Sequence, residues 1–237
     1  MGDRLQRLAD GQADAQARPV LAEGAAVASE RRSRRTRGVC KRGLQAALDA
    51  ARAAHPEKRL SLWFQDEARF GHKGRVWHRW FTRGQRPPGR CDQRYTWAHR
   101  FAAVRPATGE DFARVLPQVS TEAMNVFIER FSATRAADEH AVMALDPAGW
   151  HASRQLRVPE NVTLVPLPPY SPQRNPVERV WLYLRERHLS HRLLADYSAV
   201  VDALCRAWNE RTAERLHSLT GYPYLEQVRI YARRYQP

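Results

Sequence analysis

RLSLWFQDEARFG, at Arg59–Gly71, is the most informative segment of this sequence. An apolar run at 60–64 stands just before Asp66, which is typical of a buried β-strand that leads into a polar edge. We therefore expect a strand that ends at or near Asp66, with the carboxylate at the edge of a sheet.

Other apolar runs predict four more strands, at 76–81, 97–104, 141–146 and 162–167. The first three of the five strands should form an antiparallel meander. Helices are expected at 44–54, 121–135, 152–157 and 197–212, and another begins at Pro176 behind an Asn175 cap. Strands that alternate with helices late in the chain indicate a mixed five-stranded α/β sheet with flanking helices.

The composition is that of a basic globular protein. The 237 residues are 43% hydrophobic, and 39 Lys and Arg against 25 Asp and Glu leave a net charge of +14. Such a surplus favours polyanionic partners such as nucleic acid. No apolar run reaches the roughly 18 residues of a membrane span, so we expect no membrane partner and a cytoplasmic, nucleoid-associated location.

The first 42 residues differ from the remainder of the chain. They are rich in Ala, Arg, Gln and Gly, and their basic residues gather between Arg31 and Arg42. Such a segment buries little apolar surface to offset the entropy of ordering. We expect a loose basic N-terminal arm at 1–42 ahead of a folded domain at 43–237.

Three carboxylates occupy positions that a fold could bring together. Asp66 and Asp146 follow predicted strands, and Glu178 lies in the first turn of the helix behind Asn175. Carboxylate oxygens are the ligands that Mg²⁺ prefers, and a pair of such ions supports phosphodiester cleavage. Each acid taken singly also has a structural reading, as a turn residue or, for Glu178, as part of a capping box.

The sequence around these acids contains three motifs in order along the chain: FQDEARFG at Phe64–Gly71, LDPAGWH at Leu145–His151 and LPPYSPQRNPVERVW at Leu167–Trp181. In these motifs the chain resembles the DDE transposases of bacterial insertion sequences, specifically the insertion-sequence 630 family of the mariner superfamily. The resemblance implies a ribonuclease H-like fold and cut-and-paste DNA transposition. It also implies that Asp66, Asp146 and Glu178 are the catalytic triad and hold two Mg²⁺ (or Mn²⁺) ions.

The same resemblance implies the partners. Double-stranded DNA is expected, as transposon ends and as a TA target, with a homodimer on the DNA. Relatives carry a helix-turn-helix region ahead of the catalytic domain, and residues 1–42 contain no such pair of amphipathic helices. A separately encoded helix-turn-helix half is therefore a further expected partner. Position 147 also departs from the family, because Pro147 stands where Asn or Gly is usual and removes a backbone donor beside Asp146.

Several basic and aromatic residues are candidates for DNA contact. A loop rich in arginine, and the segment just after Asp146, could bind phosphate or stack on an unpaired base. The candidates are Arg83, Arg86, Arg90, Arg94, Trp150 and His151. The alternatives are a solvated basic loop and, for His151, a helix cap. Trp63, Trp77 and Trp181 are assigned mainly to core packing.

Two other functions are compatible with the sequence. One is a non-catalytic DNA-binding remnant of a decayed or split transposase, whose acids coordinate no metal. The other is a ribonuclease H-like nuclease that cuts DNA without strand transfer. Metal-dependent nicking separates the first from an active transposase, and joining of 3′ ends to a target separates the second.

Overall fold

The computed structural model describes residues 42–72, 83, 94–147, 153–168, 174–190, 192–226 and 228. The chain divides into two units, Met1–Val39 and Cys40–Pro237, and the structure described below belongs to the second. The predicted arm at 1–42 therefore lies almost wholly outside the described residues. So does the strand predicted at 76–81.

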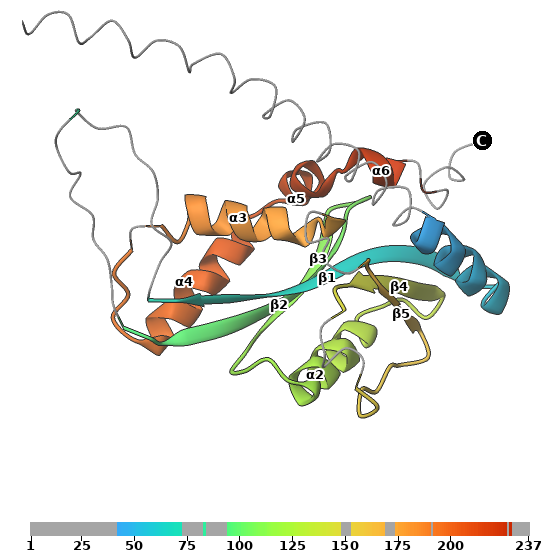
Figure 1. Ribbon diagram of the computed structural model, residues 1–237, viewed down its shortest axis with the longest axis horizontal. Coiled ribbons are helices and arrows are strands. Elements are labelled where there is room, and N and C mark those ends of the chain that lie inside the picture. Colours follow the sequence, from blue (N-terminus) through green and yellow to red (C-terminus); the bar gives the residue numbers. More distant parts are fainter. Residues whose placement is uncertain are drawn as a thin grey trace, which may run out of the picture. The chain divides into compact units, whose positions relative to one another are not determined.

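A five-stranded mixed sheet forms the centre of the unit (Figure 1). Its order is β3-β2-β1-β4-β5, with β1, β2 and β3 antiparallel to one another and β4 and β5 parallel to β1. The predicted mixed α/β sheet is thus confirmed. The strands are β1 Arg59–Gly71, β2 Trp97–Arg105, β3 Glu110–Leu116, β4 Glu139–Leu145 and β5 Val162–Pro166.

The third strand of the antiparallel meander is β3, which the sequence did not predict. Its residues EDFARVL are exposed or half-buried, because β3 is an edge strand, so the apolar run that marks a buried strand is missing. A turn at Gly109, whose φ is +73°, joins β2 to β3. The hairpin pairs Arg105 with Glu110 and continues to His99 opposite Leu116.

Strand β1 is longer than expected, and the prediction that it ends at or near Asp66 was wrong. Its parallel pairing with β4 stops at Phe64, opposite Ala144. Its antiparallel pairing with β2 continues to Gly71 and keeps the backbone extended through Asp66. Asp66 therefore lies inside β1, but two residues beyond the last pair with β4.

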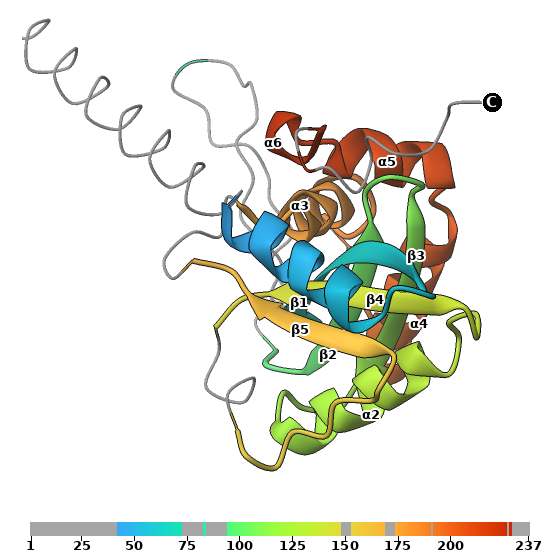
Figure 2. The same cartoon turned by 90° about the vertical axis from the view of Figure 1, so that its right-hand side faces the viewer.

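Helices cover both faces of the sheet. One face carries the helix at 42–54 and the C-terminal helices, around a core that includes Phe64, Trp181 and Trp208. The other face carries α2, which packs on Trp63 and Phe101 (Figures 1 and 2). The labelled helices are α2 Thr121–Ser132, α3 Val177–Arg187, α4 Tyr197–Asn209, α5 Ala213–Thr220 and α6 Pro223–Glu226.

The prediction of a helix at 152–157 was also wrong. Residues 153–156 form a turn, closed by the Leu156 N–H donating to the Ser153 carbonyl at 3.1 Å, and Arg157 has no helical structure. The side chain of Asn125 on α2 binds two backbone groups here, accepting from the Arg157 N–H at 2.7 Å and donating to the Gln155 carbonyl at 3.0 Å. These groups are held by a side chain where a helix would pair them along the backbone.

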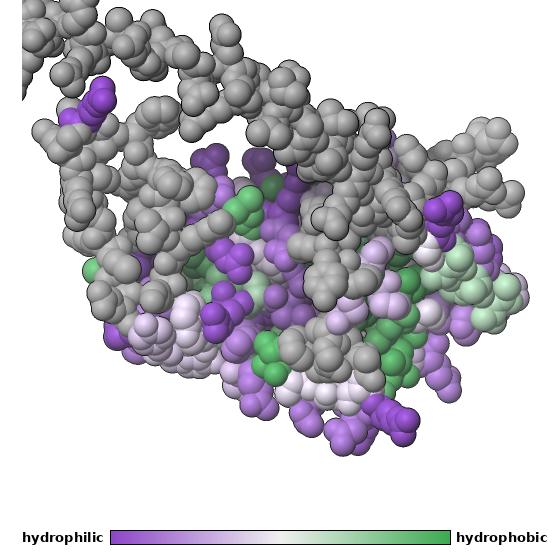
Figure 3. All heavy atoms as spheres, in the orientation of Figure 1, coloured by the Kyte–Doolittle hydropathy of each residue, from purple (hydrophilic) through white to green (hydrophobic). Residues whose placement is uncertain are grey.

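The face of the molecule drawn in Figure 3 is predominantly polar. Its described residues are mostly hydrophilic, with small apolar areas between them. Among the described residues, the helices are too short or too polar to cross a membrane.

Candidate active site

Asp66 is a buried carboxylate on β1. The residue is 8% exposed, and the indole N–H of Trp181 donates to Asp66 Oδ2 at 2.8 Å. Burial raises the pKa of Asp66 well above its ordinary value. The charges of Glu178, Glu67 and Asp146 raise this pKa further, and the hydrogen bond from Trp181 lowers it. In this environment the ionised form of Asp66 is disfavoured.

Glu178 lies in the first turn of α3 and is half-buried, and its charge acts on Asp66. Burial raises the pKa of Glu178, and the charge of Asp146 adds to this effect while that of Arg185 opposes it. The capping-box arrangement is not formed among the described residues. There the Val177 N–H is bound by Asn175 Oδ1 at 3.2 Å, and the Glu178 carboxylate accepts no hydrogen bond.

Asp146 directly follows Leu145, the last residue of β4, as the sequence predicted. Its charge acts on both Asp66 and Glu178, while Glu178 acts on Asp66. The fold therefore brings the three carboxylates within electrostatic reach of one another. They are not in ligand contact, because no three His, Cys, Asp or Glu side chains in the described part of the chain are close enough to hold an ion.

The start of α3 is joined to β1 by buried side chains. Asn175 is fully buried and donates from Nδ2 to the Gln65 carbonyl at 2.8 Å. Trp181 makes the second connection, to Asp66. The prediction that Trp181 serves mainly in core packing did not include this hydrogen bond to Asp66. Its spacing of three residues from Glu178, which places both on one side of a helix, could have indicated the second role.

The predicted DNA-contacting residues are only partly described. Arg86, Arg90, Trp150 and His151 lie outside the described residues. Arg83 is exposed. The guanidinium of Arg94 donates to the carbonyls of Leu194 and Ala195, so it links the segment before β2 to the segment before α4.

A basic and aromatic group beside Glu178 was missed by the sequence analysis. The guanidinium carbon of exposed Arg179 lies 4.8 Å from the ring centroid of Tyr222. Burial raises the pKa of Tyr222, the charges of Arg179 and Arg174 lower it, and that of Glu178 raises it. Positive charge and a half-buried phenol thus lie near Glu178. Tyr222 lies far from Glu178 in the sequence, so no local motif marks the group.

Comparison with known proteins identifies the family of this chain. A family model described as "DDE superfamily endonuclease" matches residues 61–201, which include all three carboxylates. An uncharacterized protein of Sinorhizobium fredii, y4pE/y4sA, is 45% identical over 114 residues, which are 48% of this chain and 84% of that protein.

The fold also matches solved structures of the Mos1 transposase. A paired-end complex with the left transposon end has a TM-score of 0.58 at 14% identity and is matched over 84% of this chain. A mariner Mos1 paired-end complex with Mg has a TM-score of 0.55, also at 14% identity and 84% of this chain. The match spans 62% of the Mos1 chain in each. The likeness establishes a ribonuclease H-like DDE catalytic fold.

Proposed function

This chain belongs to the DDE superfamily of endonucleases, and from that membership we propose that it is a transposase catalytic domain of the insertion-sequence 630 type. Its reaction is metal-dependent cleavage of DNA followed by strand transfer. The observation that carries the proposal is the convergence of three carboxylates from distant parts of the chain: the charges of Glu178 and Asp146 act on buried Asp66, and that of Asp146 acts on Glu178. If these acids served only as turn residues or helix caps, the fold would not need to bring their charges near one another.

Asp66, Asp146 and Glu178 are the proposed ligands of two Mg²⁺ or Mn²⁺ ions. The residues fit such ions, because hard cations select carboxylate oxygen and because, among the described residues, the hydrogen bond to buried Asp66 comes from the neutral indole of Trp181 while the neighbouring charges that act on it are acidic. When bound, the two metals activate an oxygen nucleophile and stabilise the leaving oxyanion. Mos1 has been solved in complex with Mg, which supports the choice of ion.

The chain's own residues supply position and charge. Asp66 is oriented by Trp181, and Glu178 is carried on an ordered helix that is joined to β1 through Asn175. Exposed Arg179, next to Glu178, is suitably placed to contact a phosphate of the bound DNA. We propose transposon ends and a TA target as the substrates, a homodimer as the active form on DNA, and a separately encoded helix-turn-helix half as the source of sequence recognition.

The test is a cleavage and joining assay with purified protein. A labelled duplex that carries the element's terminal repeat is incubated with a target plasmid and Mg²⁺ or Mn²⁺, together with the helix-turn-helix half. Wild-type protein should nick the duplex and join its 3′ end to the plasmid, and Asp146→Asn should do neither. Nicking without joined product would support a nuclease instead. Equal products from the wild type and Asp146→Asn, or none from either, would contradict catalysis by this site.

A further inference from the structure

Two buried side chains attach α3 to the strand that carries Asp66. Asn175 Nδ2 donates to the Gln65 carbonyl at 2.8 Å, and Trp181 Nε1 donates to Asp66 Oδ2 at 2.8 Å. Asn175 is 0% exposed and Trp181 is 1% exposed, so water cannot replace either donor. The two acceptors belong to consecutive residues of β1.

The contact made by Asn175 compensates for a missing strand partner. Pairing between β1 and β4 ends at Phe64, so Gln65 is the first residue of β1 without a partner on β4. A buried carbonyl needs a hydrogen-bond donor. The Asn175 carboxamide supplies one, and its oxygen accepts the Val177 N–H at 3.2 Å. One side chain thus joins β1 to the first turn of α3.

Glu178 lies midway between these two attachments, three residues after Asn175 and three before Trp181. Residues three apart lie on the same side of a helix. Glu178 is half-buried and flanks the packed side of α3, which is formed by Val177, Val180, Trp181 and Leu184. Consistent with this, the charge of Glu178 acts on Asp66. The two hydrogen bonds, together with the apolar packing of α3, hold the helix that carries Glu178 against the strand that carries Asp66.

We propose that Asn175 and Trp181 are positioning residues that hold Glu178 and the Asp66 carboxylate in the arrangement needed to share metal ions. Trp181 additionally leaves Asp66 Oδ1 available by binding Oδ2. This inference rests on the proposed function. It goes beyond it in assigning a role to two residues that touch neither DNA nor the reacting atoms. Groups that hydrogen-bond to metal ligands typically contribute about 10- to 100-fold to metal affinity or activity.

The Trp181 contact is tested with a matched pair of variants. Trp181→Phe keeps an aromatic ring and removes the indole donor. Trp208→Phe makes the same change in the neighbouring indole. The ring centroids of Trp208 and Trp181 are 5.7 Å apart, but the Trp208 indole N–H donates to Asp111 Oδ1 at 2.8 Å. Each variant loses one hydrogen bond from a buried indole N–H to an aspartate. Only Trp181→Phe loses that bond at the proposed active site.

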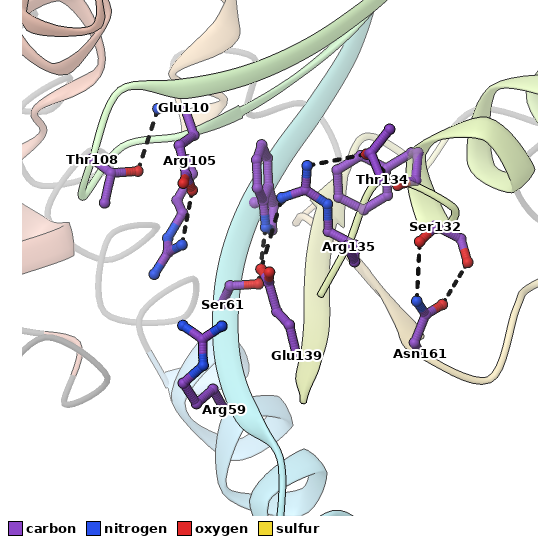
Figure 4. A network of polar contacts seen from close by, with 12 residues as sticks. Arg59, Ser61, Arg105, Thr108, Glu110, Ser132, Thr134, Arg135, Glu139 and Asn161 are labelled. Carbon is purple, nitrogen blue, oxygen red and sulfur yellow. Dashed lines mark hydrogen bonds and ion pairs between the residues drawn. The ribbon is translucent and has the colours of Figure 1, made fainter. Parts of the chain in front are cut away.

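The Asn175 contact is tested in the same way. Asn175→Ala removes the link between α3 and β1. Asn161→Ala removes a similar link elsewhere, where Asn161 Nδ2 donates to the Ser132 carbonyl at 3.2 Å and Ser132 Oγ donates to Asn161 Oδ1 at 2.6 Å (Figure 4). This pair keeps the inference testable if Trp181→Phe does not fold.

The measurements are Mn²⁺ affinity by titration calorimetry, thermal unfolding without metal, and kcat and KM for DNA cleavage. Trp181→Phe and Asn175→Ala should bind Mn²⁺ about 10- to 100-fold more weakly and lose kcat by a similar factor, with KM for DNA nearly unchanged. Their controls should retain wild-type affinity at a comparable loss of thermal stability. Variants that match their controls in Mn²⁺ affinity and kcat, while the wild type cleaves DNA, would overturn this inference alone. A wild-type protein that neither binds Mn²⁺ nor cleaves DNA would overturn the proposed function and the inference with it.

Discussion

The charge of Glu178 raises the pKa of Asp66, although the two residues are far apart in the sequence. One is on β1 and the other on α3, and Asp146 at the end of β4 acts on both. Without metal the fold therefore holds three acids in a region where the charges of Asp146 and Glu178 disfavour ionisation of Asp66. This arrangement of acids destabilises the folded state in the absence of metal. A bound divalent cation would turn its contribution to the free energy of folding into a favourable one.

Neutralising Asp66 should stabilise the metal-free protein. Asp66→Asn keeps an oxygen that can accept from Trp181 and removes a buried charge. We expect the free energy of unfolding at pH 7 in EDTA to rise by about 0.5–2 kcal/mol, the usual range for a stabilising substitution, while cleavage is lost. Asp111→Asn is the control, because Asp111 binds Trp208 and lies 3.7 Å from Arg211, and its neutralisation should destabilise. Denaturant unfolding measures both, and a loss of stability in Asp66→Asn would contradict the expectation.

The stabilisation by Asp66→Asn should depend on pH. Because the folded pKa of Asp66 is raised, the folded chain keeps a proton that the unfolded chain releases above about pH 4. The unfolded state then binds fewer protons, so the free energy of unfolding of the wild type falls as pH rises between the two pKa values. The difference between Asp66→Asn and the wild type should be small near pH 4 and grow toward neutral pH. If the difference in free energy of unfolding between the two proteins did not change with pH, the pKa of Asp66 would not be raised in the folded state.

Divalent metal should stabilise the wild type through Glu178. At a concentration about 100 times the dissociation constant, a ligand that binds only the folded state adds about 2.7 kcal/mol. Each kcal/mol corresponds to about 2–4 °C in Tm for a domain of this size. Glu178→Gln should lose most of the Mn²⁺-dependent rise in Tm. Glu122→Gln should keep it, because Glu122 occupies the equivalent first turn of α2 on the opposite face of the sheet. Equal rises in both variants would argue against metal binding by Glu178.

Gly109 should not tolerate a side chain. Its φ is +73°, and a Cβ there would lie 1.9 Å from the Ala213 carbonyl oxygen. Gly109→Ala should destabilise by at least about 2 kcal/mol, from the left-handed backbone and the clash with α5. Gly43→Ala is the control, since Gly43 is in the helix at 42–54 with nothing within 4 Å. That change should be neutral or stabilise by up to about 1 kcal/mol. Similar effects of the two changes on denaturant unfolding would count against the hairpin geometry.

Removal of residues 1–39 should weaken DNA binding without unfolding the remaining unit. The basic run that begins at Arg31 would neutralise phosphates, and the logarithm of the binding constant falls with log salt by about 0.9 per phosphate contact. The truncated protein should show a flatter salt dependence in fluorescence anisotropy, with Tm nearly unchanged. An unaltered slope would mean that the arm makes no phosphate contact.

Much of the fold was predictable because the decisive strands are buried. β1, β2, β4 and β5 all contain apolar runs, and the helices at 44–54 and α2 show amphipathic spacing, with the Ser120 hydroxyl accepting from Ala123 N–H as a cap. β3 was missed because an edge strand has few buried side chains. The helix at 152–157 was wrong because the Asn125 side chain, a contact across elements, takes the backbone groups that a helix would pair.

The sequence by itself determined which chemistry the chain offers: three acids within recognisable blocks, a basic surplus and a mixed α/β order of strands and helices. Only the tertiary structure decided that Asp66 lies inside a strand, that Trp181 binds it, and that Asn175 joins α3 to β1. The reason is that sequence patterns report burial and local geometry, which depend on near neighbours. Hydrogen bonds between Asn175 and Gln65, or Trp181 and Asp66, depend on how distant elements pack, and no local pattern encodes that packing.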